Sequence, residues 1–368
     1  MFCKDNELSL LLLGVNSEKN IKQKHKNVTI MKKIFGLLIS AVALFGAVSC
    51  SEPETNNSVN AGELVTTTLT VDLANLGSRI AGQSEMIDKV AYGVYDVSDN
   101  GRFLEILSSA HAANGPVDFK NGQATVNITL FKGKTYDFVF FAYCSSNNAY
   151  SIDWANRVLN VSYADATDAA KGDLANLEAR DAFFHVEQDF VAGSDATFTL
   201  KRPFAQLNVG QSYEDYNNMQ KTGNCILKSS LTTKAYTQMS LGRDTYGNVL
   251  GQLTDVTFEL NNVIDIAEPA GNDDLEVVLP RDTDPTLYKH LSMNYLLVKN
   301  EELINAKVSL LGNEGTLFVR DYANVPVQRN HRTNIIGNII SDEYAFTVLI
   351  DKNFINDKNF DEEQNPIQ

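Results

Sequence analysis

Short stretches in which apolar and polar residues alternate one by one recur along this chain, and this period of two limits its fold more than any other feature. In the first clear stretch, one face carries Val65, Thr67, Leu69, Val71 and Leu73. The residues between them are threonines and one aspartate. Successive side chains of a β-strand point to opposite faces, so the pattern predicts a strand with one mostly apolar, inward face.

Similar stretches follow through the rest of the chain, separated by turn signals such as Asn121-Gly122. The expected strands include residues 89–95, 103–107, 124–130, 138–144, 196–200, 204–209, 256–260, 275–279, 296–298, 306–311 and 316–319. Residues 138–144 are apolar on both faces, which predicts a central strand, and the Ala- and Asp-rich residues 164–178 predict a short helix. Many short strands with turn signals indicate an all-β chain of Greek-key sandwiches.

The chain has 368 residues, of which 43% are hydrophobic, and this length favours two domains over one sandwich. We place the boundary near 200–203, which gives an N-terminal domain over residues 80–202 and a C-terminal domain over residues 203–368. The formal net charge of -15 repels phosphate backbones, so nucleic acid is not an expected partner. The same charge favours solubility outside a cell.

The segment 31–50 is typical of a targeting signal. It begins with Met-Lys-Lys, continues with an apolar run over residues 34–48 and ends with Ser49-Cys50. The run is short for a membrane-spanning helix, which needs about 20 residues, and is typical of a signal peptide. Its end, Ala47-Val48-Ser49-Cys50, resembles the lipobox of bacterial lipoproteins, in which the cysteine is lipidated. Residues 1–30 are interpreted as a non-native upstream extension, and residues 51–79 as a tether followed by the first strand.

The residue types that carry catalysis or bind metals form no recognisable motif in this chain. Cys3, Cys50, Cys144 and Cys225 lack the spacing of a zinc or redox site, and we expect buried thiols rather than a disulfide between Cys144 and Cys225. His185, Glu187 and Asp189 would share one face of a strand and could hold a metal, but a solvated face is the stronger interpretation. We therefore expect neither an enzyme nor a cofactor.

Four segments, in their order along the chain, resemble the type V pilins, or fimbrillins, of some Gram-negative outer surfaces. They are the lipobox at Cys50, Ser78-Arg79-Ile80-Ala81, the segment 200–207 and the segment 327–338. The second is similar to the family's Asn/Thr-Arg-Ala processing site, with Ile80 in place of the usual alanine. The last is the most specific, and its motif residues are Arg329, Asn330, His331, Thr333 and Asn334.

The resemblance implies two tandem transthyretin-like β-sandwich domains and export as an outer-membrane lipoprotein. It also implies cleavage between Arg79 and Ile80 by a trypsin-like, arginine-specific protease, which removes the strand around Leu69 together with the lipid anchor. The groove left behind would accept a strand from the next subunit. The expected partners are other copies or related pilins in a head-to-tail polymer, and the expected location is an extracellular fimbrium that supports adhesion.

The C-terminal segment offers a donor strand for such a polymer. Phe346, Val348 and Ile350 alternate with Ala345, Thr347 and Leu349, and Phe354 continues their face after Lys352. The same pattern is equally compatible with the last strand of the chain's own domain, and the sequence leaves both interpretations open.

A second interpretation of the function is a lipid-anchored surface protein that is not polymerised, either a glycan-binding protein or a fimbrial anchor. Trp154 and Tyr150 would be its candidate aromatic platforms. The polar run 329–331 could suggest a catalytic cluster, but such a run more often shapes the entry of a strand and forms hydrogen bonds with nearby loops.

Overall fold

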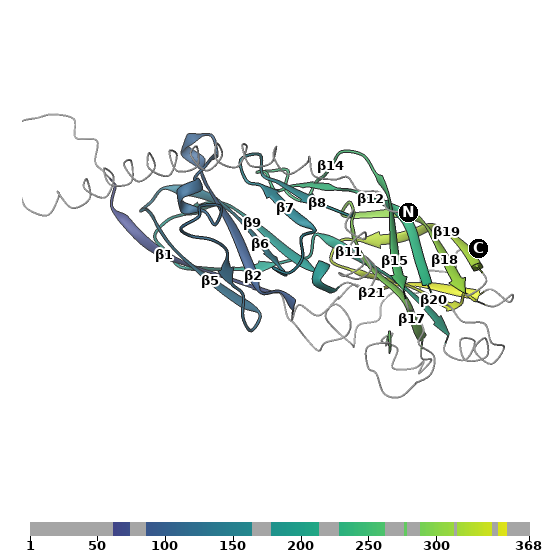
Figure 1. Ribbon diagram of the computed structural model, residues 1–368. Helices are drawn as coiled ribbons and strands as arrows, with labels where there is room; N and C mark the ends of the chain where they lie inside the picture. Colours follow the sequence, from purple (N-terminus) through teal and green to yellow (C-terminus); the bar gives the residue numbers. More distant parts are fainter. Residues whose placement is uncertain are drawn as a thin grey trace, which may run out of the picture. The chain divides into compact units, whose positions relative to one another are not determined.

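The computed structural model describes residues 62–73, 86–163, 178–212, 228–261, 276–277, 288–312, 315–340 and 345–351 (Figure 1). All of them belong to one compact unit that begins at Gly62. Across these described ranges the regular structure is β-strand with short 3-10 turns, which confirms the expected all-β sandwich class. No helix among them is long and apolar enough to cross a membrane. The signal segment 31–50 lies outside the described residues, as does the helix expected at 164–178 except for Glu178.

Two facing sheets form the first half of the unit. The strands of this half are β1 (Leu64–Leu73), β2 (Lys89–Asp96), β3 (Arg102–Phe103), β4 (Val117–Asp118), β5 (Gln123–Phe131), β6 (Thr135–Tyr143), β7 (Tyr150–Asp153), β8 (Val158–Val161), β9 (Ala182–Val191) and β10 (Ala196–Leu200). One sheet has the order β10-β1-β5 and the other β3-β2-β6-β9, with β4 also paired to β2. Leu69 and Val71 of β1, Val126 of β5 and Phe138 and Phe140 of β6 belong to one buried core.

The expected centre of a sheet is confirmed in β6, which pairs with β2 on one side and β9 on the other. Phe138 and Phe140 face the first core, while Val139 and Phe141 face a second one, so the strand is buried on both faces. The strand expected over residues 103–107 is wrong beyond Phe103. Residues Glu105–Leu107 form a 3-10 turn, because Ser108 Oγ bonds back to the carbonyl of Leu104 and to the amide of Val94.

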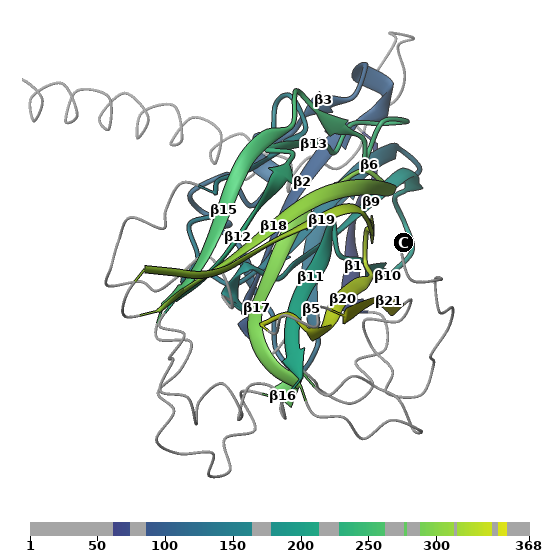
Figure 2. The same cartoon turned by 90° about the vertical axis from the view of Figure 1, so that its right-hand side faces the viewer.

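The second half repeats the two-layer arrangement (Figure 2). Its strands are β11 (Phe204–Ser212), β12 (Lys228–Ala235), β13 (Gln238–Ser240), β14 (Val249–Leu250), β15 (Thr254–Asn261), β16 (Glu276–Val277), β17 (Tyr288–Leu297), β18 (Glu301–Gly312), β19 (Gly315–Gln328), β20 (Arg332–Asn338) and β21 (Ala345–Asp351). One sheet has the order β16-β17-β11-β20-β21 and the other β15-β12-β18-β19. Leu207 and Val209 of β11 share a core with Leu231, Phe258 and Val308 of the opposite sheet.

A small shared sheet joins the two halves. Its order is β14-β13-β8-β7, so two strands come from each side of the boundary expected near 200–203. Beside it a third core combines Phe141 and Leu159 of the first half with Phe204, Met239 and Tyr295 of the second. The backbone pairing therefore continues across the junction.

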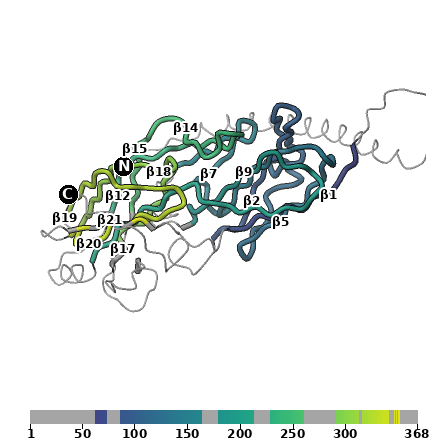
Figure 3. The backbone as a smooth tube through the Cα atoms, turned by 180° about the vertical axis from the view of Figure 1, so that it is seen from behind, coloured from purple at the N-terminus to yellow at the C-terminus, as the bar shows by residue number. Residues whose placement is uncertain are grey.

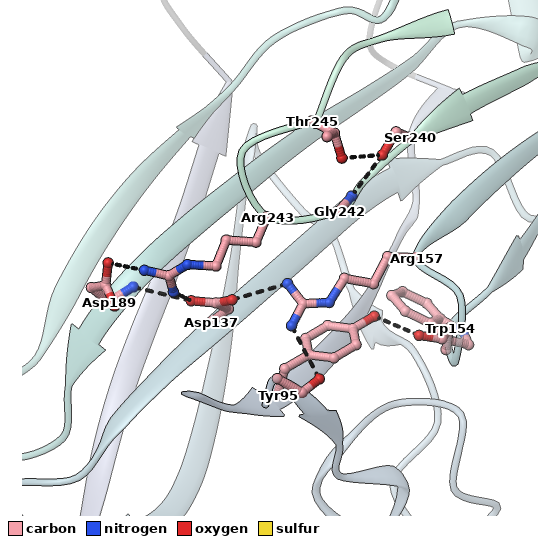
Figure 4. A network of polar contacts seen from close by, with 10 residues as sticks. Tyr95, Asp137, Trp154, Arg157, Asp189, Ser240, Gly242, Arg243 and Thr245 are labelled. Carbon is pink, nitrogen blue, oxygen red and sulfur yellow. Dashed lines mark hydrogen bonds and ion pairs between the residues drawn. The ribbon is translucent and has the colours of Figure 1, made fainter. Parts of the chain in front are cut away.

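A buried carboxylate adds an electrostatic link at this junction (Figure 4). Asp137 of β6 is fully buried and bonds Arg157 of the β7–β8 turn at 2.9 Å and Arg243 of the loop after β13 at 2.8 Å. Arg243 also bonds the carboxylate of Asp189, which lies at a bulge in β9 with a left-handed backbone (φ 58°). The guanidinium carbon of Arg157 lies over the ring of Tyr95, 3.7 Å from the ring centroid. No local sequence signal pointed to this network, because Asp137 and Arg243 are 106 residues apart.

Candidate functional site: the seat of the first strand

The first strand, which Figure 3 shows close to β5, lies between β5 and β10 and not at an edge of its sheet. It pairs antiparallel with β5, from Leu64 opposite Phe131 to Asp72 opposite Gln123. On its other side Leu69–Leu73 pair in parallel with β10. Taking β1 away would therefore leave unpaired backbone groups on two facing strands, and such edges bind an incoming strand of matching pattern.

The inward face of β1 contributes directly to the first core. Thr67, Leu69, Val71 and Leu73 are buried, Leu69 and Val71 completely, and Val65 packs partly against the same cluster. The alternation read from the sequence is thus present in the strand. Complete burial of a leucine or valine side chain contributes about 1.5–3 kcal/mol. The space between β5 and β10 that holds β1, called the seat below, therefore binds the strand mainly through these inward side chains.

Polar contacts on the outward face of β1 are few and exposed. The backbone amide of Thr68 donates to Asp195 Oδ1 at 2.8 Å, and Thr199 Oγ1 donates to Asp72 Oδ1 at 2.9 Å. Lys132 pairs with Glu63 at 2.9 Å, where both side chains are more than half exposed. Exposed ion pairs contribute little to stability, so the outward face adds modestly to the binding of β1.

The predicted processing residues lie outside the described part of the chain. Cys50 precedes it, and Arg79 and Ile80 fall between the end of β1 at Leu73 and the next described residue, Met86. Lipidation and cleavage stay predictions from the sequence.

The donor candidates occupy a strand of their own sheet. Phe346, Val348 and Ile350 lie in β21, which pairs antiparallel with β20 and forms the edge of the five-stranded sheet. Val348 is buried in the second-half core, and the ring of Phe346 meets Tyr322 edge-on at 4.9 Å between centroids. Ile350 pairs opposite Thr333, while Phe354 lies outside the described residues. Among the described residues the segment is therefore the last strand of its own sheet, and β20 is its paired neighbour.

The motif of residues 329–334 forms the turn from β19 to β20 and the start of β20. Asn330 adopts a left-handed backbone (φ 60°), its Oδ1 accepts from the amide of Arg202 at 3.2 Å, and its own amide donates to the carbonyl of Phe204 at 2.8 Å. The carbonyl of His331 accepts from the amide of Gln206 at 3.0 Å. The motif thus fixes the chain where it enters the second half, as expected for a run that shapes a strand entry.

The remaining motif side chains also bond to the protein itself. Thr333 Oγ1 donates to the carbonyl of Pro326, and Asn334 Oδ1 accepts from Asn208, both at 2.8 Å. Arg329 donates to the carbonyl of Val298 at 2.7 Å, and burial lowers its pKa to about 10. These contacts connect the motif side chains to other parts of the protein and so support its fold.

We expect replacement of Asn330 to separate its two contributions. Asn330→Gly keeps the left-handed turn and loses the acceptor for the Arg202 amide, which should cost about 1 kcal/mol of unfolding free energy. Asn330→Ala loses the acceptor and also places a methyl-bearing residue at positive φ, which should bring the total to about 2 kcal/mol. Urea denaturation measures both values, and equal losses would show that the backbone conformation contributes nothing.

An open pocket of about 740 Å³ lies beside the motif. Its lining includes Arg329 and His331, together with His185 and Glu187 of β9. His185 stacks on Phe198 and bonds Glu187 at 3.1 Å. The idea that Asp189 shares their face is wrong, because the β9 bulge turns Asp189 towards Arg243. Among the residues that the structure describes, no group of three or more His, Cys, Asp or Glu side chains could hold a metal.

The candidate aromatic platforms are packed against the protein. Trp154 stacks on Phe103 and lies over Gly93, where an added Cβ would come within 2.6 Å of the indole ring. Tyr150 packs between Phe141 and Phe204, and its hydroxyl donates to the carbonyl of Arg180. Both residues are half-buried and pack against the third core, so neither is a fully exposed platform. Cys144 is a buried free thiol, as expected.

A buried ion pair lies next to the motif, and the sequence did not single it out as a pair. Asp181 and Arg202 are almost completely buried. Arg202 Nε lies 2.8 and 3.0 Å from the two carboxylate oxygens, and its Nη2 lies 2.7 Å from Oδ2. The guanidinium carbon of Arg202 also lies over the ring of Phe183, 4.3 Å from the ring centroid. Arg202 stood in the segment 200–207, but nothing near it in sequence indicated Asp181 as its partner.

Comparison with known proteins gives one family and several solved folds. The model described as "Family of unknown function (DUF6562)" matches residues 59–368. No curated protein matches. Similar solved structures include a candidate cell adhesion protein from Bacteroides ovatus (12% identity, 80% of this chain and 99% of that one, TM-score 0.43). They also include a fimbrial assembly protein from Parabacteroides distasonis (12%, 78% and 95%, TM-score 0.39) and the fimbrial anchor protein Mfa2 from Porphyromonas gingivalis (10%, 79% and 99%, TM-score 0.38).

Proposed function

The chain belongs to DUF6562, a family of unknown function, and we propose that it is a structural subunit of an extracellular fimbria that polymerises by strand exchange. The observation that carries this proposal is the position of β1 between β5 and β10. A strand near the start of a domain that fills a slot between two others can be removed without breaking any other pairing in its sheet. The space left between the two strands then has unpaired backbone groups on both sides and apolar side chains at its base.

The route to that state follows from the sequence resemblance. The chain is exported as a lipoprotein through Cys50 and stands at the outer membrane before processing. An arginine-specific protease then cuts after Arg79, which follows β1 shortly in the chain, and this cut separates β1 and the lipid from the rest. The released subunit becomes part of a fimbrium that supports adhesion.

The incoming strand is the C-terminal segment of another copy or of a related pilin. Because β21 is an edge strand and β20 is its one paired neighbour among the described strands, it can leave its sheet without opening a second described ladder. Leaving costs the burial of Val348 and the contact of Phe346 with Tyr322. Burial of the same apolar side chains between β5 and β10 of the neighbour would offset this cost. The contact is head-to-tail and does not close on itself, so repetition gives a fibre.

Limited digestion of the purified full chain with an arginine-specific protease tests the proposal. We expect a new N-terminus at Ile80, followed by growth of ladders or filaments that size-exclusion chromatography and electron microscopy detect. Arg79→Ala is the matched control and should stay intact and monomeric. A new N-terminus elsewhere, or a product cut at Ile80 that stays monomeric with related subunits present, would contradict it.

A lipid-anchored surface protein that stays unpolymerised is the second candidate. It is favoured by the placement of β21 within its own sheet, with Val348 in the core. This candidate expects material from the cell surface to begin at Cys50 and to retain β1, so the same N-terminal sequencing separates the two functions.

A further inference from the structure

The inward row of β1 contains one residue with a polar group. Leu69, Val71 and Leu73 are aliphatic, whereas Thr67 is 1% exposed and its Oγ1 has no hydrogen-bond partner among the residues that the structure describes. Opposite Thr67 on β5 lies Ile128, a buried residue of the same core. The hydroxyl is thus buried away from water beside apolar side chains that cannot form a hydrogen bond with it.

A valine of the same shape would fill this position at lower free energy. Threonine and valine are both β-branched and differ by a hydroxyl in place of a methyl group. A buried hydroxyl without a partner keeps the full cost of its lost hydration. The strand that occupies the seat in the intact chain is therefore not the best strand for it.

We propose that the position of Thr67 is a selective subsite of the seat, which binds an apolar side chain from the C-terminal strand of a second copy in preference to the threonine of β1. This inference rests on the proposed function. The C-terminal strand carries Phe346, Val348 and Ile350 in succession on one face, and Lys352 follows them on that face. The registers that place Phe346, Val348 or Ile350 at the subsite replace the threonine with an apolar group, whereas the register that places Lys352 there does not. The difference biases the exchange towards assembly once the cut has freed β1.

The test uses the full chain with a site-specific protease sequence inserted between Arg79 and Ile80. Thr67→Val is compared with the unchanged chain and with Thr70→Val, a half-exposed position on the other face of β1. After cutting, a labelled peptide of residues 64–73, with threonine or valine at position 67, displaces the bound fragment. We expect Thr67→Val to slow release of its fragment about tenfold, and the valine peptide to bind about tenfold more tightly, which corresponds to ~1.4 kcal/mol. Thr70→Val should change either value less than twofold.

The unfolding of the uncut chain supplies a measurement that does not depend on exchange. Thr67→Val should raise the urea midpoint of the chain, and Thr70→Val should leave it nearly unchanged. Equal midpoints, or equal peptide affinities for threonine and valine, would overturn the subsite. A raised midpoint without any peptide uptake after cutting would support the preference for valine but overturn strand exchange. The failure of the subsite and the failure of strand exchange are therefore distinguishable.

Discussion

Asp181→Ala is expected to lower the free energy of unfolding by about 3–5 kcal/mol, because it leaves the buried guanidinium of Arg202 without its carboxylate. Since domains of this kind are stable by about 5–15 kcal/mol, such a loss brings the variant close to unfolding at room temperature. Urea denaturation followed by circular dichroism measures the change.

Two controls isolate the buried charge from the loss of a side chain. The double variant Asp181→Leu with Arg202→Met removes both charges and should recover most of the loss, since apolar side chains can replace a buried pair at little cost. Asp118→Ala breaks the exposed pair with Lys89 and should change stability little. A loss below about 1 kcal/mol in Asp181→Ala would show that the pair does not stabilise the junction.

The elements that could be predicted from the sequence are those whose signal is local. The alternation from Val65 to Leu73 predicts β1 and its inward face, and the apolar run around Phe140 predicts a central strand. Asn121-Gly122 predicts a tight turn, and both residues adopt positive φ (54° and 78°) with Lys120 paired to Gln123. Each of these features follows from a period or a turn residue within a few positions.

The elements that were missed depend on partners far away in sequence. Strand β12 (Lys228–Ala235) carries few apolar residues, of which Leu231 and Ala235 are buried, so it was not predicted. It is held by ladders to β15 and β18. The choice between donor strand and own last strand for β21 was open for the same reason: pairing with β20 has no local signature. The Asp137 network likewise forms only when the halves meet.

Leu69→Asp is expected to expel β1 from its seat while the rest of the unit stays folded. Leu69 is completely buried, and an aspartate there would place an unpaired charge among apolar side chains, a cost above about 4 kcal/mol. Because β1 fills a slot between β5 and β10 and no other pairing runs through it, the loss should remain local. The uncut variant should then bind the peptide of residues 64–73, which the unchanged chain excludes.

Trp154 reports whether the remaining structure survives, since it is the one tryptophan of the chain and packs on Phe103 at the junction core. Its emission should stay native in Leu69→Asp, with peptide uptake measured by fluorescence anisotropy. Thr66→Asp, at an exposed position of the same strand, should neither bind peptide nor lose stability appreciably. If Leu69→Asp instead shifts the Trp154 emission to that of the unfolded chain, β1 is an integral strand. The seat could then not be emptied, and assembly by strand exchange would fail with it.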